Sequence, residues 1–285
     1  MTRRFVAAPA DRPAQGPAVG GPVDPLLAAL AVRYGAAHRD APAAPADPLR
    51  DRRRPVQVAV PEGYEDGYAY PVVVWLHDTG HTEGTVHAAL AAMGGRNCLG
   101  LAVRGLPCPG AGGSGFGWSD DAVDALADRL PELMSALAAE WHVHPDRVFL
   151  AGAGAGADAA AALAANRPDW FAGVALLGGG TLPPDLPALE DDPAEEWAAF
   201  TDDIADAVPE YAGENLQDLS PVAGLRVLIA AGDGRREAPA ALSAAAAWRA
   251  CRAVAEVRVS AESPLSNASL RAVDAWLLAG LGVGV

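Results

Sequence analysis

Apolar residues in this chain form short runs that alternate with longer, alanine-rich segments. Residues 56–60 alternate apolar with smaller or polar positions and predict a first, edge-type strand, whereas residues 72–76 are apolar throughout and predict a central strand. Five further strands are expected: residues 98–103, 147–151, 173–177, 226–230 and 255–259. Four helices are expected: residues 85–93, 119–141, 158–167 and 270–278. This alternation predicts an α/β fold with a mostly parallel, doubly wound sheet and helices on both faces.

The turn after the strand at 147–151 carries the most informative local pattern. Gly152, Gly154 and Gly156 separate that strand from the alanine-rich helix that follows. Strand, glycine turn and helix form the setting of a nucleophile elbow, G-x-S-x-G, in which a serine sits on a strained turn above the sheet. The middle position here is Gly154, which has no side chain. The frame of the elbow is therefore present without its nucleophile.

The pattern divides the chain into an N-terminal segment and one main domain. Residues 1–54 hold a Pro/Gly/Ala-rich stretch, expected to be a mobile tail over 1–23, and a predicted amphipathic helix over 24–39. Residues 55–285 form the predicted α/β domain, with a glycine-rich loop over 105–117. Residues 182–220 interrupt the alternation and are expected to be an insertion over the carboxyl edge of the sheet, where substrates of such folds bind.

Composition narrows the classes of partner. The net charge is −15 and the 21 basic residues are all arginine, so we expect no nucleic-acid partner. No apolar run approaches the roughly 18 residues that span a bilayer, and no secretory signal opens the chain, so we expect a cytoplasmic protein without a membrane partner. No cofactor and no resident metal are expected. A small-molecule ligand and a protein partner both stay open.

Several ordered stretches resemble one family. The run from Tyr70 to Gly80, YPVVVWLHDTG, resembles the strand and "LHG-x-G" oxyanion loop of α/β-hydrolases. HPDRVFLAG at 144–152 and NRPDWFAG at 166–173 are similar to the passages around the elbow in the phospholipase/carboxylesterase-like and feruloyl-esterase-like branch. LRVLIAAGDG at 225–234 resembles the late strand whose loop carries the catalytic acid. The resemblance spans about residues 55–278 and implies an α/β-hydrolase fold with a serine, acid and histidine triad.

The same comparison identifies departures at each catalytic position. Gly154 stands at the serine position, and aligning the acid loop places Arg235 at the acid position, with Asp233 two residues early. No histidine follows the last strand, because all six precede the elbow. In the loop that would form the oxyanion hole with Ala155, the residues His77, Asp78 and Thr79 put a carboxylate where a glycine usually lies. An ionised Asp78 would oppose the negative charge that develops in ester cleavage.

These departures predict a catalytically impaired hydrolase-fold protein with a binding or structural role. Losing the serine or histidine of such a triad costs on the order of a million-fold in turnover. The alternative is an active hydrolase with a relocated nucleophile, for which the candidates are Cys108, Ser114, Ser119 and Asp158. A metal site built on His77 and His81, with Asp78 and Glu83, is a further alternative. His81 and Trp118 are expected to line a pocket, although core packing explains Trp118 equally well.

Dinucleotide binding is a weaker interpretation of the glycine turn. Residues 152–157 fit G-x-G-x-x-A between a strand and a helix. That fingerprint also requires an acid at the end of the next strand, and residues 173–180 supply none. The degenerate elbow explains the glycines better.

Overall fold

A computed structural model of the 285-residue chain describes residues 6–7, 48–51, 53, 55–108, 115–179 and 222–280. The predicted helix at 24–39 and the predicted insertion at 182–220 lie outside the described residues, as does Ser114. The two-part division of the chain therefore stays a prediction. No helix in the described part is long and apolar enough to cross a membrane.

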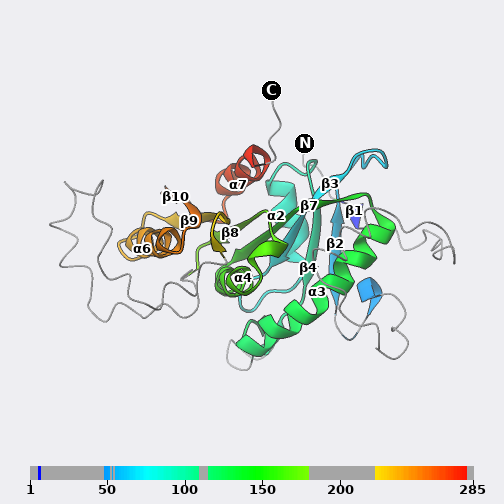
Figure 1. The fold of residues 1–285 in the computed structure, drawn as a ribbon, viewed down its shortest axis with the longest axis horizontal. Coiled ribbons are helices and arrows are strands. Elements are labelled where there is room, and N and C mark those ends of the chain that lie inside the picture. Colours follow the sequence, from blue (N-terminus) through cyan, green and yellow to red (C-terminus); the bar gives the residue numbers. More distant parts are fainter. Residues whose placement is uncertain are drawn as a thin grey trace.

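An eight-stranded sheet organises the described residues, in the order β1-β2-β4-β3-β7-β8-β9-β10 (Figure 1). From β4 to β10 neighbouring strands run parallel, and β1 and β2 add an antiparallel edge. The strands are β1 Val6–Ala7, β2 Val56–Val60, β3 Tyr70–Leu76, β4 Leu99–Val103, β7 Val143–Ala153, β8 Gly173–Leu177, β9 Arg226–Gly232 and β10 Val254–Ser260. A separate hairpin pairs β5 (Leu106–Cys108) with β6 (Gly115–Gly117).

Helices cover both faces of the sheet, because the buried central strands present apolar side chains to both sides. Val72, Val74 and Leu76 join a core cluster with α3 (Asp120–Glu140), α4 (Ala155–Asn166) and α6 (Glu237–Ala250). Val73 and Trp75 face the opposite cluster, beneath α2 (Thr85–Ala92) and α7 (Asn267–Ala279). Short 3-10 turns lie at Pro48–Arg50 and Pro168–Trp170. The predicted doubly wound α/β architecture is confirmed.

The structure corrects two expectations at the ends of the pattern. Residues 56–60 do form a strand, but it is not the edge, because Val6 and Ala7 pair with Val60 and Ala59 outside it. The predicted tail at 1–23 therefore contributes a short strand. The predicted loop over 105–117 contains two short strands, β5 and β6, which pair antiparallel.

Candidate functional site

The candidate site lies where the parallel strands end. The carboxyl ends of β3, β7, β8, β9 and β10 share one edge of the sheet, as parallel pairing requires. The backbone binds these ends together: Gly154 donates its N–H to Leu177 O at 2.9 Å, and Gly178 donates to Ala230 O at 2.9 Å. Residues far apart in sequence therefore meet at this edge.

The turn between β7 and α4 has the backbone of an elbow. Gly154 adopts φ 54° and ψ −122°, a region that side chains rarely occupy. The flanking glycine Gly156 allows close approach, because a Cβ there would collide with Leu76 O and His77 O at the end of β3. The first turn of α4 thus lies directly against β3. The sequence placed the strand and helix correctly, although α4 starts three residues earlier than expected.

The carboxylate of Asp78 occupies the space above this turn. Its Oδ1 accepts hydrogen bonds from the backbone N–H of Thr79 at 2.7 Å and of Ala155 at 2.9 Å. A Cβ placed on Gly154 would meet the carboxylate carbon and both of its oxygens before any other atom. In α/β-hydrolases the residue after the nucleophile and a residue of the loop after β3 supply the two N–H donors of the oxyanion hole. By this correspondence, Asp78 Oδ1 binds the two N–H groups that are predicted from the sequence as the oxyanion donors.

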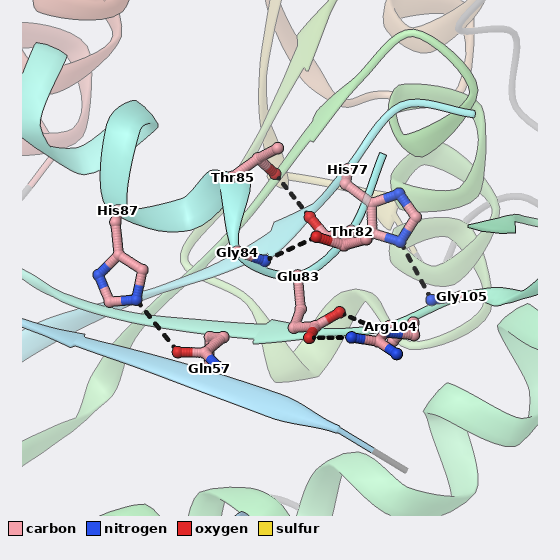
Figure 2. A network of polar contacts seen from close by, with 9 residues as sticks. All are labelled: Gln57, His77, Thr82, Glu83, Gly84, Thr85, His87, Arg104 and Gly105. Atoms are coloured by element: carbon pink, nitrogen blue, oxygen red, sulfur yellow. Dashed lines mark hydrogen bonds and ion pairs between the residues drawn. The ribbon is translucent and has the colours of Figure 1, made fainter. Parts of the chain in front are cut away.

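The His77 ring ties the loop after β3 to the segment after β4. Its Nδ1 donates to Asp78 O at 2.8 Å, and its Nε2 accepts from the N–H of Gly105 at 3.1 Å (Figure 2). These partners fix the neutral tautomer with the proton on Nδ1. Burial lowers the pKa of His77, which outweighs the hydrogen bond to the Asp78 carbonyl and the nearby Glu83 charge. Both ring nitrogens are therefore committed to the backbone, and neither is placed to act as a base or a metal ligand.

The β5–β6 hairpin closes over the same loop. Trp118, directly after β6, donates its indole N–H to His77 O at 2.8 Å, and the two rings lie 5.3 Å apart. Gly80 donates its N–H to Phe116 O at 2.9 Å. Trp118 thus helps to hold the loop after β3, while its ring packs against the core. Cys108 is half-buried in this hairpin, close to Gly117.

An ion pair holds a buried carboxylate of the loop after β3. Glu83, which is 4% exposed, accepts two hydrogen bonds from Arg104 Nε and Nη2, both at 2.6 Å (Figure 2). Burial alone would raise the pKa of Glu83, but the Arg104 guanidinium lowers it overall. Arg104 also lies over the Phe116 ring, 4.7 Å from its centre. Arg104 was missed from sequence, because no local pattern links positions 21 residues apart.

The remaining candidate polar residues are dispersed. His81 is exposed, and His87 donates from Nε2 to Gln57 Oε1 at 3.2 Å (Figure 2). Ser119 caps α3 by accepting from the N–H of Ala122 at 3.4 Å, and Asp158 is exposed on the first turn of α4. Within the described ranges no three His, Cys, Asp or Glu side chains are grouped to hold a metal ion.

The end of β9 carries a carboxylate that the sequence did not single out. Asp233 and Arg235 are both exposed. Glu237, on the first turn of α6, folds back and accepts the N–H of Gly232 at 3.1 Å through its Oε2. The sequence clue to Glu237 is its place at the start of a helix, where a carboxylate often accepts hydrogen bonds from free backbone N–H groups.

Serines occupy the turn before α7, where the resemblance predicts a histidine position. Ser266 caps α7 by accepting from the N–H of Ser269 at 3.2 Å, and the Ser269 hydroxyl donates to Ser263 O at 3.1 Å. Pro264 lies beside Gly178, at the end of β8. This turn therefore reaches the same edge of the sheet as the elbow and carries hydroxyl groups.

Comparisons with known proteins agree with this geometry. Among solved structures, the chain is similar to the Bacillus cereus carboxylesterase (15% identity, TM-score 0.55, covering 81% of this chain and 97% of that one). It is also similar to a carboxylesterase from Mesorhizobium loti (20%, 0.53, 81% and 97%) and to a ferulic acid esterase (17%, 0.52, 80% and 92%). No curated protein matches the chain in sequence. These likenesses show the α/β-hydrolase fold.

The family follows from the sequence model. The model of the Esterase family, described as "Putative esterase", matches residues 49–264, which is most of the chain. The match runs from the 3-10 turn before β2 to the serine turn before α7, so it includes the elbow and the loop after β3. The chain, with its α/β-hydrolase fold, belongs to the Esterase family.

Proposed function

We propose that this chain is a non-hydrolytic member of its family, in which the former catalytic edge serves a binding or structural role. The observation that carries the proposal is the Asp78 carboxylate on the N–H groups of Thr79 and Ala155, beside a glycine at the nucleophile position. A serine esterase needs those donors free and a hydroxyl beside them. Here the donors are bound and the hydroxyl is missing.

The carboxylate opposes ester cleavage in two ways. It excludes a substrate carbonyl from the donors, and its negative charge repels the oxyanion that forms when the carbonyl is attacked. Removing a single oxyanion donor typically costs about 100- to 1,000-fold in turnover. Here both donors are bound by the chain itself, so the penalty adds to the loss of the nucleophile.

The proposal also holds that the catalytic base and the catalytic acid are missing. No histidine follows residue 144 in the sequence, and both nitrogens of His77 are bonded to backbone groups. Glu237 is close to the position of the acid, but its carboxylate caps the N–H of Gly232 and has no imidazole to orient. Once the triad is broken as a unit, further losses within it cost little. The residual activity of about a thousand-fold over water that such enzymes keep comes from the oxyanion hole and substrate binding, so with the hole occupied we expect less than that.

Hydrolysis of short-chain p-nitrophenyl esters by the purified protein tests the proposal. We expect no more than trace turnover, and no rescue by Gly154→Ser, because the new side chain would meet Asp78 and would lack a base. Gly154→Ser combined with Asp78→Gly should admit the serine without creating an efficient enzyme. Efficient hydrolysis by the wild-type protein would refute the proposal.

Two inhibitors identify the alternative if activity is found. A serine-directed phosphonate that abolishes hydrolysis would indicate a relocated serine nucleophile such as Ser119. A chelator that abolishes it would indicate a metal at His77 and His81. The structure offers less support for either, because Ser119 caps a helix and His77 has no free ring nitrogen.

A further inference from the structure

The outer edge of β10 is a polar backbone surface within the described part of the chain. There, β10 pairs with β9 alone and forms the end of the sheet (Figure 1). Val254 donates its N–H to Leu225 O, on the β9 side, at 2.8 Å. Because consecutive residues of a strand point their N–H and C=O groups to opposite sides, Ala255, Val257 and Val259 direct theirs outward.

The two faces of this edge differ in chemistry. Toward α7 lie Glu256 and Arg258, joined by a 2.8 Å ion pair, with side chains 49% and 37% exposed. Toward α6, Ala255 and Val257 pack on the core, and Val259 is 45% exposed. Opposite-charge residues two positions apart, flanking a residue with an outward backbone, form a self-complementary pattern.

We infer that β10 pairs antiparallel with β10 of a second copy of this chain, about a two-fold axis at Val257. In that register the two Val257 residues exchange both backbone hydrogen bonds, and the N–H of Ala255 reaches the C=O of Val259 in the second copy. Glu256 then lies opposite Arg258 of the second copy, and the two-fold axis repeats the pair. Centring the pairing on Ala255 or Val259 loses this match.

The surroundings of the edge suit a second copy. Arg249 of α6 donates from Nε and Nη2 to Ala255 O, at 3.1 and 2.8 Å, so this side of α6 borders the edge. Leu242, two turns earlier on the same side of the helix, is 48% exposed. A two-fold axis at β10 brings the two α6 helices together and covers both Leu242 side chains. Both lone pairs of the Ala255 carbonyl accept from Arg249, so in the dimer the N–H of Val259 from the second copy replaces one of these two bonds.

Isolated charges on an edge strand also protect it against pairing. Protection requires only charge, however, and does not require that the charges match across a two-fold axis. The two explanations make opposite predictions about oligomeric state, and the experiments below separate them.

Light scattering measures the molar mass of the protein as it elutes from a size-exclusion column at about 0.15 M salt. We expect twice the 29.1 kDa of one chain. Arg258→Glu should halve the mass, because it places like charges opposite one another, and adding Glu256→Arg should restore the dimer. Arg271→Glu makes the same charge change at an exposed position of α7 and should leave the dimer intact. A monomeric wild type, or a dimer indifferent to Arg258→Glu, would overturn the inference.

Cysteine cross-linking tests the register. Hydrogen-bonded antiparallel partners lie about 5.5 Å apart between Cα atoms, within the range that a disulfide spans. Val257→Cys should therefore form a covalent dimer under mild oxidation. Val254→Cys is the matched control: Val254 is 62% exposed, but the two copies of it would lie roughly 20 Å apart. Faster cross-linking through position 254 would mean random edge contact and would reject the register.

Discussion

Replacing Gly154 with alanine tests the geometry of the candidate site through stability alone. The backbone at φ 54° and ψ −122° should cost a side chain about 1–3 kcal/mol. The new Cβ would also displace the Asp78 carboxylate from the N–H groups of Thr79 and Ala155. Hydrogen bonds to a charged group are each worth about 1.5–3 kcal/mol, and partial exposure favours the lower end. We expect Gly154→Ala to lower the free energy of unfolding by about 4–6 kcal/mol.

A double-mutant cycle separates the two contributions. Asp78→Ala removes the three atoms nearest to the new Cβ, so in that background Gly154→Ala should cost only the backbone strain of about 1–3 kcal/mol. The difference is a coupling energy, which for groups in direct contact is typically about 0.5–3 kcal/mol. Urea denaturation at pH 7, followed by tryptophan fluorescence, measures all four corners of the cycle.

Gly63 provides the matched control. It also has a positive φ, of 81°, but a Cβ there would meet nothing within 4 Å. Gly63→Ala should therefore cost backbone strain alone, and the same amount with or without Asp78. If Gly154→Ala costs as much in the Asp78→Ala background as in the wild type, Asp78 does not occupy the space above the elbow and our reasoning about the site is wrong.

Three further predictions concern the surroundings of the site and the far end of the sheet. Glu83→Gln should lower the free energy of unfolding at pH 7 by about 1–3 kcal/mol, because it breaks a buried pair whose arginine is partly solvated. The pKa of Glu83 is lowered in the folded state, so the ionised Glu83 stabilises the protein fully above the ordinary pKa of 4.5. This stabilisation is lost as the pH falls through the folded pKa. The free energies of unfolding of the wild type and Glu83→Gln, measured in urea from pH 7 to 3, should therefore converge. The pKa of His77 is lowered in the folded state, so the protein should lose stability as the pH falls below the ordinary value of 6.5 and through the folded pKa. Nitrogen NMR should show a neutral ring with its proton on Nδ1 that ionises below the ordinary pKa, and ionisation at or above 6.5 would contradict the assignment. Gly280→Ala places a Cβ on the Arg226 guanidinium at the end of α7, so it should lower the free energy of unfolding by about 1–3 kcal/mol. An unaltered urea midpoint would contradict this prediction.

Local composition was enough to place the central strands. The apolar runs in β3 and β8 have both faces buried, so no alternation is needed to identify them. The first half of β7 was missed, because residues 143–146 become a strand only through pairing with β3 near Tyr70. The α6 helix was also missed, since a run of alanine without a strong polar face gives little periodicity. The strand β1 is two residues long and is held only by its partner, β2.

The residues of the candidate site also differ in whether local sequence identifies them. Gly154 and the loop around Asp78 were identified because a motif fixes their spacing within a short stretch of sequence. Arg104 and Glu237 were missed because their partners, Glu83 and the N–H of Gly232, meet them only after the loops have folded. The direction of the Asp78 side chain also depends on folding, because two N–H groups 76 residues apart must converge on one oxygen.

In the proposed function, Asp78 and Gly154 act as one physical unit. A side chain at position 154 would collide with the Asp78 carboxylate, so a serine there is incompatible with Asp78 in its observed place. Conversely, without a substrate oxyanion the N–H groups of Thr79 and Ala155 need an acceptor, and the carboxylate supplies one from within the chain. Restoring only the serine would therefore leave the hole filled, and removing only the carboxylate would leave two donors without their acceptor. Under the proposed function, reversal toward catalysis requires both changes together with a histidine after β10.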